Sequence, residues 1–437
     1  MAVGTVAVVG GGLAGLSAAL ELQEAGFEVD VYERSRLLGG RATSFEVDGH
    51  VVDNGQHVYL ACCTEFIRFV KRAGMARALH TQDRFDVAVY SKDGLRSGLR
   101  AGSLPAPLHL LTSFAGYAHL STGGKLRIAR ALVELRLRPG SATEDRSFAE
   151  WLRAHGQSAE TMHAFWEPFL VPALNAPLDR MNAAEAAFVI STAFLHDRDA
   201  ASFGFATVPL AEIMEAAASR LHAVHRASAV LEMRARPEGV DLQTPSGDAH
   251  YDAAVLAVPP RALAKLLGDP AAFGVPALDV YEPFAIMDVH LWHDAGALPF
   301  DFAALLDSPV QWIFQKAPGY VCCSLSAADA LVAVPTAQVV DETWKELRRA
   351  VPELAAAGLV RGAATRNPEG TYLARPGTQR PTSRTLLPNL AIAGAWTATG
   401  WPDTMESAVR SGLAAARVLL KGNDAGSSRS RRRLAAR

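Results

Sequence analysis

The sequence predicts an α/β protein with a Rossmann-like dinucleotide-binding domain and a second, discontinuous domain of mixed α and β structure. Three observations lead to this expectation. A glycine-rich turn joins a strand pattern to a helix pattern at the start of the 437-residue chain. Segments that fit the same domain return in the middle of the chain and near its end. The two stretches between them have another character, since one is rich in helical patterns and the other in long strands.

The glycine-rich turn follows an apolar run at residues 6–9 that has the length and composition of a strand. The turn fits G-x-G-x-x-G and opens a helical pattern that ends near Gly26. A second short strand ends at Glu33, where an acid accepts hydrogen bonds from the adenosine ribose. The turn and the helix N-terminus are therefore expected to bind a pyrophosphate. The contacts predicted here are Gly10, Gly12, Leu13, Ala14, Gly15, Glu33 and Arg34.

A second motif, ERSRLLGGRATSF, starts at Glu33. A nicotinamide-dependent dehydrogenase needs no further pair of glycines at this point. The E-x5-GGR-x-[ST] arrangement resembles the family of flavin amine oxidases, phytoene desaturases and protoporphyrinogen oxidases. The resemblance implies FAD as the cofactor and an FAD-binding domain of the amine-oxidase type. It also implies that Gly39, Gly40 and Arg41 lie along the FAD pyrophosphate and the edge of the flavin.

The C-terminal segment LPNLAIAGAWTATGWPDTMESAVRSG resembles the closing motif of that family, a strand, a glycine turn and a helix. By this resemblance Gly394 and Trp396 contact the cofactor. The N–H groups near Thr404 and Met405 would stabilise negative charge on the reduced flavin. In the middle of the chain, Val230 matches a residue whose backbone faces the adenine. The resemblance runs from residue 6 to about residue 420.

One position departs from the family pattern. The family usually carries an Asp after the C-terminal Ala-Gly pair, where it hydrogen-bonds the ribityl chain, and this chain has Ala395. Loss of one such hydrogen bond costs about 1 kcal/mol, so weaker retention of FAD is expected. The substitution also leaves open a lipid-binding protein that has lost its flavin chemistry.

The order of the motifs predicts a discontinuous domain organisation. The FAD-binding domain is assigned to residues 1–90, 205–275 and 380–420, and the substrate domain to residues 91–204 and 276–379. Residues 421–437 form a basic tail that is expected to be disordered.

Composition agrees with a folded protein of two domains, since 49% of the residues are hydrophobic and the net charge is −2. No signal peptide is recognised, and no apolar run reaches the roughly 18 residues that span a bilayer. The four cysteines form the adjacent pairs Cys62-Cys63 and Cys322-Cys323, without the spacing of a zinc site. A cytoplasmic protein with reduced thiols, no bound metal and no nucleic-acid partner is expected.

Several segments resemble one branch of the family, the squalene-associated FAD-dependent desaturases, which are hydroxysqualene dehydroxylases of bacterial hopanoid biosynthesis. They include VVDNGQHVYLACCTEFIRFV, FWEPFLVPALNAP and PVQWIF. The resemblance implies reductive removal of an allylic hydroxyl from a C30 isoprenoid alcohol, which yields squalene and water. The nearest alternative is a carotenoid-type desaturase that uses oxidised flavin. The sequence identifies no electron donor for the flavin.

The GQH run supplies the predicted catalytic residue. A hydroxyl leaves as water only after protonation, and His57 is predicted to be the acid because imidazolium is available near neutral pH. The alternative is a histidine bonded to backbone or cofactor. Gly55 and Gln56 are expected to contact the flavin or the substrate, and His290 is a weaker candidate for the acid. Four aromatic residues are candidates for a tunnel wall or for the core: Trp166, Phe169, Trp292 and Trp312.

A lipid substrate predicts a peripheral position at the inner face of the membrane. The stretch LPAPLHLLTSFAGYAHLSTGGKLRIARAL is rich in leucine and aromatic residues and ends in a basic helical pattern. It is interpreted either as a membrane-dipping segment or as a helix that faces the core. In the first case Leu110 and Leu111 would contact lipid.

Overall fold

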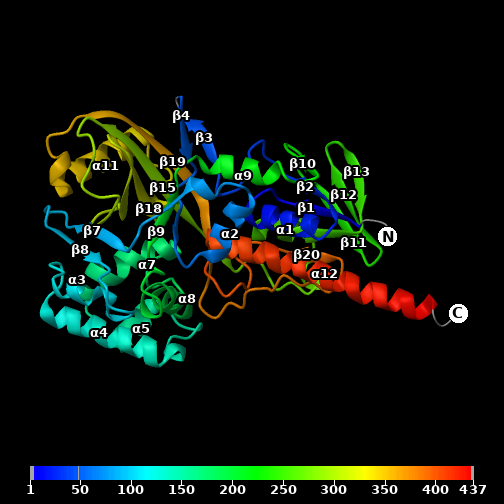
Figure 1. Cartoon of the computed structure of the whole chain (residues 1–437), viewed down its shortest axis with the longest axis horizontal. Coiled ribbons are helices and arrows are strands. Elements are labelled where there is room, and N and C mark those ends of the chain that lie inside the picture. The colour runs from blue at the N-terminus through cyan, green and yellow to red at the C-terminus, as the bar shows by residue number, and fades with distance from the viewer. Residues whose placement is uncertain (1–3, 48, 435–437) are drawn as a thin grey trace.

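The computed structural model describes residues 4–47 and 49–434 and contains two principal sheets (Figure 1). The first is a parallel sheet with the strand order β10-β2-β1-β14-β20. Its strands are β1 (Thr5–Val9), β2 (Glu28–Tyr32), β10 (Ala223–His225), β14 (Ala253–Leu256) and β20 (Leu390–Ile392). The apolar central strands are buried on both faces, as in other parallel sheets. This sheet confirms the predicted Rossmann-like domain.

Helices cover one face of the parallel sheet. The helices α1 (Leu13–Glu24) and α12 (Met405–Leu434) lie side by side there (Figure 1). Their close approach depends on Gly412, because a Cβ at this position would lie 2.2 Å from the carbonyl oxygen of Ala14. The helices α2 (Thr64–Arg72) and α9 (Leu210–Ala218) pack beside them.

The opposite face of the parallel sheet is covered by α10 and a small antiparallel sheet. Their bounds are α10 (Pro260–Leu267), β11 (Glu232–Arg236), β12 (Gly239–Thr244) and β13 (Gly247–Tyr251). The period of two along β1 explains the division, since Val6 and Val8 pack against α1 and α12 whereas Ala7 and Val9 pack toward α10.

The second principal sheet has the strand order β19-β15-β18-β17-β16-β7-β8. Its strands are β7 (Asp86–Tyr90), β8 (Arg96–Arg100), β15 (Tyr281–His293), β16 (Phe302–Leu305), β17 (Trp312–Ala317), β18 (Tyr320–Ser326) and β19 (Leu359–Ala374). The helix α11 (Thr336–Ala350) covers one face, where Met287, Val289 and Leu291 meet Trp344. The strand β7 pairs with β8 and β16 and therefore belongs to this sheet. The second domain thus begins before residue 90, which the sequence analysis took as the end of the first segment of the FAD-binding domain.

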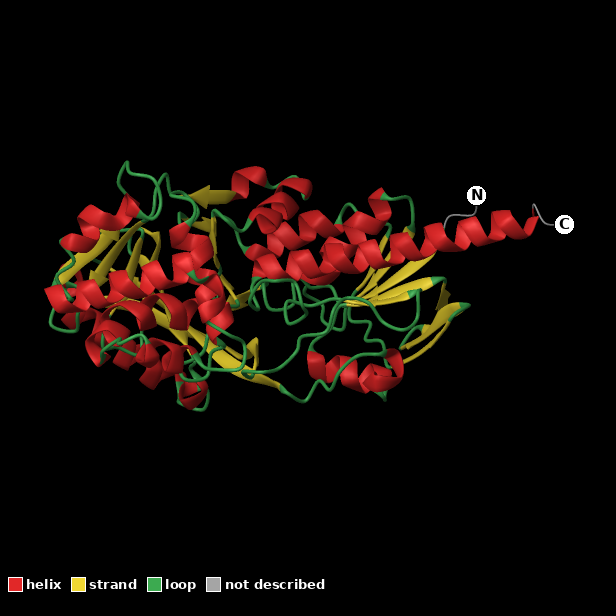
Figure 2. Ribbon diagram, turned by 90° about the horizontal axis from the view of Figure 1, so that it is seen from below, coloured by secondary structure: helices red, strands yellow, loops and turns green. Residues whose placement is uncertain are grey.

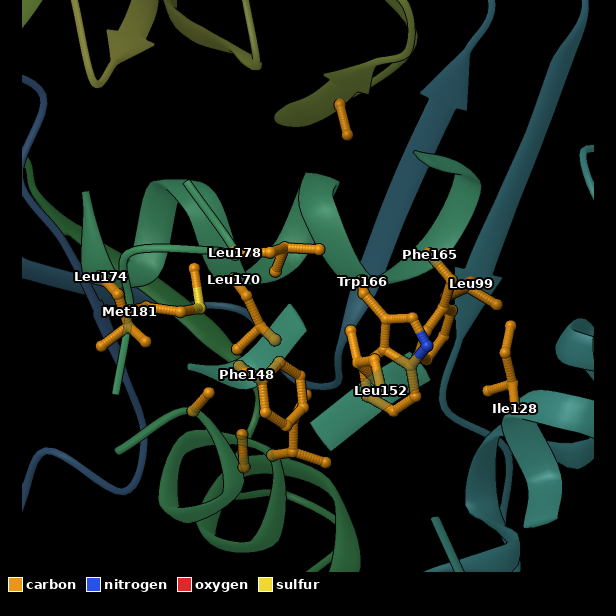
Figure 3. Packing of buried hydrophobic residues seen from close by; sticks show 14 of the residues in the cluster. Leu99, Ile128, Phe148, Leu152, Phe165, Trp166, Leu170, Leu174, Leu178 and Met181 are labelled. Carbon is orange, nitrogen blue, oxygen red and sulfur yellow. The ribbon is translucent and has the colours of Figure 1, made fainter. Parts of the chain in front are cut away.

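A group of helices completes the second domain, below the seven-stranded sheet in Figure 1 and at the same end of the molecule in Figure 2. They are α3 (Leu111–Ala115), α4 (Thr122–Leu137), α5 (Phe148–Ala154), α6 (Ala159–Thr161), α7 (Glu167–Leu174) and α8 (Ala183–Ile190). A capping box fixes the start of α5, since Ser147 and Glu150 exchange side-chain and backbone hydrogen bonds. Their core contains Phe148, Trp166 and Leu170 (Figure 3).

Two small sheets lie between the principal ones. They are formed by the hairpin of β3 (Ser44–Val47) and β4 (His50–Asp53), and by β5 (Val58–Leu60), β6 (Leu79–Thr81) and β9 (Phe203–Ala206). The hairpin carries the chain from the GGR motif to the GQH motif, and so brings both motifs to one region.

The C-terminal helix is longer than the sequence suggested. It continues to Leu434, through most of the segment 421–437 for which a disordered tail is predicted. No proline interrupts the segment and its arginines favour a helix, so the helix continues past residue 420 although Gly422 and Gly426 have low helix propensity. Residues 435–437 lie outside the described part of the chain. Over the described residues, no helix combines the length and apolar character needed to cross a bilayer.

Candidate cofactor and substrate site

A cavity of about 870 Å³ lies between the two domains. It brings together motifs that are up to 395 positions apart in the chain. The predicted residues that line it are Gly10, Gly12, Leu13, Ala14, Glu33, Arg34, Gly39, Gly40, Arg41, Gly55, Gln56, His57, Val230, Gly394, Trp396, Thr404 and Met405. Gly15, the remaining predicted contact, lies behind this wall and shapes the loop.

The glycine-rich loop leaves room for a dinucleotide. Gly10 has a φ of +112°, and a Cβ there would lie 2.3 Å from the carbonyl oxygen of Ala257. A Cβ on Gly15 would lie 1.9 Å from the carbonyl oxygen of Gly10. The N-terminus of α1 has no side-chain cap at Gly12, so its first N–H groups face the cavity and fit a pyrophosphate.

Glu33 is placed to bind a ribose. Its side chain is buried, and its two oxygens accept hydrogen bonds from the N–H groups of Gly11 and Ser35, each at 2.8 Å. Each carboxylate oxygen retains acceptor capacity for a second donor. The orientation fixed by the two backbone donors therefore fits the two hydroxyls of an adenosine ribose.

The GGR motif runs beside the glycine-rich loop, since the N–H of Gly39 donates to the carbonyl oxygen of Gly11 at 2.8 Å. The guanidinium of Arg41 forms a two-pronged ion pair with Asp403 at 2.8 Å and also donates to the carbonyl oxygen of Gly370. Asp403 was not among the predicted site residues. It lies 362 positions from Arg41, and only its place just before the C-terminal helix marks it in the sequence.

The N-terminus of α12 is directed at the cavity, as predicted from the closing motif. Thr404 precedes the helix and accepts the N–H of Ser407 on its hydroxyl at 3.3 Å, while Thr404 and Met405 line the cavity. Ala395 also lines it and is 3% exposed, and its carbonyl oxygen accepts the Ser407 hydroxyl. The helix dipole thus reaches the cavity, and the chain supplies no carboxylate at position 395.

His57 lines the cavity beside Gln56, with its Nε2 3.2 Å from the carbonyl oxygen of Arg41. Burial lowers the pKa of His57, because the charged imidazolium loses solvation that the nearby Asp53 does not replace. The imidazole is therefore neutral near pH 7, with Nε2–H donating to Arg41. This geometry favours the alternative considered for His57, a histidine bonded to backbone.

His290 does not reach the cavity. It is buried on β15, where its Nδ1 lies 2.8 Å from the hydroxyl of Tyr320. Burial lowers its pKa to about 4, so this ring is also neutral near pH 7. It is not positioned to protonate a molecule bound in the cavity.

Aromatic and aliphatic side chains from the second domain form much of the remaining wall: Phe169, Leu170, Val189, Ile190, Phe194, Phe203, Trp312 and Phe314. Two aromatic residues considered for a tunnel wall are elsewhere. Trp166 is fully buried in the helical core, where its indole N–H donates to Gln157 (Figure 3). Trp292 stacks on Tyr320 with ring centroids 4.6 Å apart. The sequence alone could not distinguish these two core residues from residues of the cavity wall, because the same residue types are favoured in both places.

The cysteine pairs take different places. Cys62 and Cys63 line the cavity, whereas Cys322 and Cys323 are buried in β18, and all four are free thiols. Within the described part of the chain, no group of three or more His, Cys, Asp or Glu side chains is arranged to hold a metal ion.

Comparisons with known proteins agree with this geometry. A "Hydroxysqualene dehydroxylase" of Rhodopseudomonas palustris is 29% identical, over 95% of this chain and 98% of its own length. A "Zeta-carotene desaturase, chloroplastic/chromoplastic" of Arabidopsis thaliana is 23% identical, over 93% and 83%. The solved structure of wild-type putrescine oxidase bound to putrescine has the same fold, with a TM-score of 0.74 at 18% identity over 96% and 99%. The model of the family described as flavin containing amine oxidoreductase matches residues 13–420. The chain therefore belongs to this family and is an FAD-dependent oxidoreductase.

Proposed function

We propose that this protein reductively dehydroxylates hydroxysqualene to squalene. The observation that carries the proposal is the composition of the cavity wall. A dinucleotide-binding loop and the N-terminus of α12 contribute to the same cavity as a set of aromatic and aliphatic side chains. Such a wall suits a hydrocarbon chain beside the flavin. The similarity to proteins named hydroxysqualene dehydroxylase supports the choice of substrate.

The residues of the cavity have separable tasks in this reaction. Glu33 would hold the ribose of the adenosine diphosphate part of FAD and the N-terminus of α1 its pyrophosphate, and the N-terminus of α12 would face the flavin. When bound and reduced, FAD supplies the hydride that replaces the hydroxyl. The apolar wall excludes water, which would otherwise capture an allylic cation.

The leaving oxygen needs a proton, and three polar groups of the wall are poorly suited to provide one. Asn175 is committed to other bonds, since its amide donates to Phe284 and Thr371 and its oxygen accepts from Ala327. Gln56 lines the cavity, but an amide is no acid. The neutral imidazole of His57 would serve better to orient a bound group than to protonate it.

The experiment that tests the proposal uses purified protein loaded with FAD. It is incubated without oxygen, with a chemical flavin reductant and hydroxysqualene, and the extract is analysed by mass spectrometry. We expect squalene only when enzyme, FAD and reductant are all present. A sample containing holoenzyme but no reductant is the matched control.

A carotenoid-type desaturase is the second candidate, because zeta-carotene desaturases also align with nearly the whole chain. It would draw on the same apolar wall but would require oxidised flavin. Incubation of the oxidised holoenzyme with zeta-carotene and phytoene separates the two reactions. Desaturated products, together with no squalene in the first experiment, would favour this candidate.

We also propose that the second domain rests on a membrane. Three leucines of the predicted segment are exposed, namely Leu104, Leu108 and Leu111. The helix α4 adds an exposed face that carries Leu126, Val133 and Leu137 among the arginines 127, 130 and 136. Exposed apolar side chains flanked by cations suit the surface of an anionic bilayer. Such a position gives a lipid substrate a short route to the protein.

A further inference from the structure

The strand β15 carries a buried carboxyl group that the proposed reaction has not yet used. Asp288 is 1% exposed. Its neighbours Met287 and Val289 face the core under α11, so the alternation of the strand turns Asp288 toward the opposite face. That face meets the loop of Gly55, Gln56 and His57. Asp288 therefore lies one layer behind the wall of the cavity.

The contacts of Asp288 lead to the cavity by a short path. In the antiparallel pair of β15 and β18, Asp288 lies directly opposite Ser324, and Ser324 lines the cavity. The thiol of Cys322 lies 3.7 Å from Oδ1 of Asp288. Oδ2 is buried and has no hydrogen-bond partner among the described residues. The carboxyl group is thus held next to a hydroxyl that reaches the site, with one oxygen free.

The free oxygen faces the GQH loop. A Cβ on Gly55 would lie 3.4 Å from Oδ2 of Asp288 and 3.6 Å from Nε2 of His57. Both groups therefore border the small space that glycine leaves at this position. A larger residue at position 55 would take up the space in which the carboxyl group can reorient.

Burial raises the pKa of Asp288 to about 6, although the polar groups of Gln56, Ser324 and Cys322 and the charge of Lys316 oppose the rise. An ordinary aspartic acid is fully ionised near neutral pH. Asp288 instead titrates close to the pH at which a general acid works best. An apolar substrate in the cavity would exclude more water and favour the protonated form further.

We propose that Asp288 stores the proton that the leaving hydroxyl requires and delivers it through the hydroxyl of Ser324. This inference rests on the proposed dehydroxylation. Ser324 is the group that would touch the substrate, and Asp288 acts through it as a positioning and proton-storing residue. The assignment gives a role to a carboxyl group that is buried with no ion pair among the described residues.

Atoms and electrons balance in this proton and hydride transfer. The C–O bond of the allylic alcohol breaks with its electron pair on oxygen, and this oxygen takes the proton of the Ser324 hydroxyl. The oxygen of Ser324 takes the proton of Asp288, so that water leaves and a carboxylate remains. The allylic carbon is reduced by the hydride of the flavin cofactor. Asp288 then regains one proton from solvent for each turnover.

Other titratable groups also face Asp288. They are Tyr320 and Cys322 on β18, Lys316 on β17 and His57 on the GQH loop, while the charge of Asp288 also reaches Cys323 on the opposite face of β18. Burial raises the pKa values of the tyrosine and of both thiols, so these three stay protonated near neutral pH. A test near neutral or acidic pH must therefore distinguish the titration of Asp288 from that of His57, whose pKa is lowered.

The test compares Asp288→Asn and Ser324→Ala with His57→Gln and the matched control Thr365→Val. Thr365 lies opposite Asp288 on the other neighbouring strand and is buried, but does not line the cavity. The holoenzymes are assayed for squalene formation between pH 5 and 9, and their flavin content is measured. Infrared difference spectra of the wild type and Asp288→Asn over the same pH range record the stretch of a protonated carboxyl group.

We expect kcat of Asp288→Asn to fall by about 100-fold or more at unchanged flavin content. The wild-type rate should fall above the pKa of Asp288, and this limb should be absent in Asp288→Asn but present in His57→Gln and Thr365→Val. Ser324→Ala should also lose activity but keep the infrared signal. A wild-type pH profile in Asp288→Asn, or full activity in Ser324→Ala, would overturn the relay.

The infrared signal keeps the two proposals distinguishable. A protonated carboxyl group that titrates near pH 6 and disappears in Asp288→Asn would establish the stored proton even if the wild type produced no squalene. In that case the proposed substrate would be wrong. If the wild type produces squalene but shows no such signal, the inference about Asp288 fails and the proposed function stands.

Discussion

Two buried carboxyl groups far apart in the chain are suited to different tasks because their surroundings differ. Glu33 is buried against two backbone N–H groups, which hold its oxygens in place. Asp288 is buried with one oxygen unpaired, and its pKa rises. The first arrangement suits the recognition of hydroxyl groups, and the second suits the storage of a proton.

Replacing Glu33 by Gln should weaken FAD binding by about 10-fold or more, because a neutral amide loses charge-assisted bonds to the ribose and to Gly11. The dissociation constant is measured by titrating apoprotein with FAD and following flavin fluorescence. Glu28→Gln is the matched control, since Glu28 is exposed at the start of β2, the strand that Glu33 directly follows. Equal FAD affinity in Glu33→Gln and the wild type would contradict the assigned contact.

Asp288 should also affect the pH dependence of stability. Because its pKa is raised to about 6, the native protein retains a proton that the unfolded chain releases at lower pH. The carboxyl group therefore costs nothing below about pH 4, and its destabilisation grows until about pH 6. Relative to the wild type, Asp288→Asn should gain up to roughly 3 kcal/mol between these pH values and then remain level. Urea unfolding at several pH values measures this difference, and a constant difference would contradict it.

At the scale of the element, the glycine-rich loop could be predicted because its constraint is local. A strand, a tight turn and a helix follow within residues 5–24, and Gly10 has the positive φ that glycine readily adopts in such a turn. The same is true of the long strands β15, β17 and β18, which apolar and β-branched runs predicted. Contacts between distant segments, in contrast, leave no local pattern in the sequence. The pairing of Arg41 with Asp403 and the place of Asp288 behind Gly55 became visible only in the fold.

Substitution of Gly15 by Ala tests the packing of this element. The added Cβ would overlap the carbonyl oxygen of Gly10, and a backbone atom cannot move aside as a side chain can. We expect a loss of about 3 kcal/mol in the free energy of unfolding, and little retained flavin. Gly140→Ala is the control, because no atom lies within 4 Å of its added Cβ. Normal stability and flavin content in Gly15→Ala would contradict the close approach.

At the scale of the whole molecule, the two domains divide the work. The parallel sheet with its helices and the second domain lie at opposite ends of the molecule (Figures 1 and 2). The first presents the loop and two helix N-termini, and the second supplies the apolar wall and the exposed leucines in and near α3 and α4. The sequence predicted this division, and one of the two interpretations of the leucine-rich segment placed Leu110 and Leu111 in contact with lipid. Leu110 instead packs partly against the helical core, whereas Leu108 and Leu111 are about half exposed.

The double variant Leu108→Asp with Leu111→Asp should therefore release the protein from anionic liposomes without unfolding it. Two buried leucines would contribute about 3 kcal/mol or more to lipid binding, so the bound fraction in a flotation assay should fall by 10-fold or more. Leu386→Asp serves as the control, because Leu386 is 71% exposed on the nucleotide-binding domain. Equal flotation of the double variant and the wild type would exclude this surface as the anchor.

The most direct test of the central claim is a single-turnover measurement. Anaerobic holoenzyme is reduced with one equivalent of reductant and mixed with hydroxysqualene, while the flavin absorbance is followed and squalene is quantified at the same times. We expect the oxidised flavin spectrum to return at the rate at which squalene forms, with one squalene per flavin. A flavin that stays reduced in the presence of hydroxysqualene, in an enzyme whose oxidised form desaturates a carotenoid, would contradict the claim.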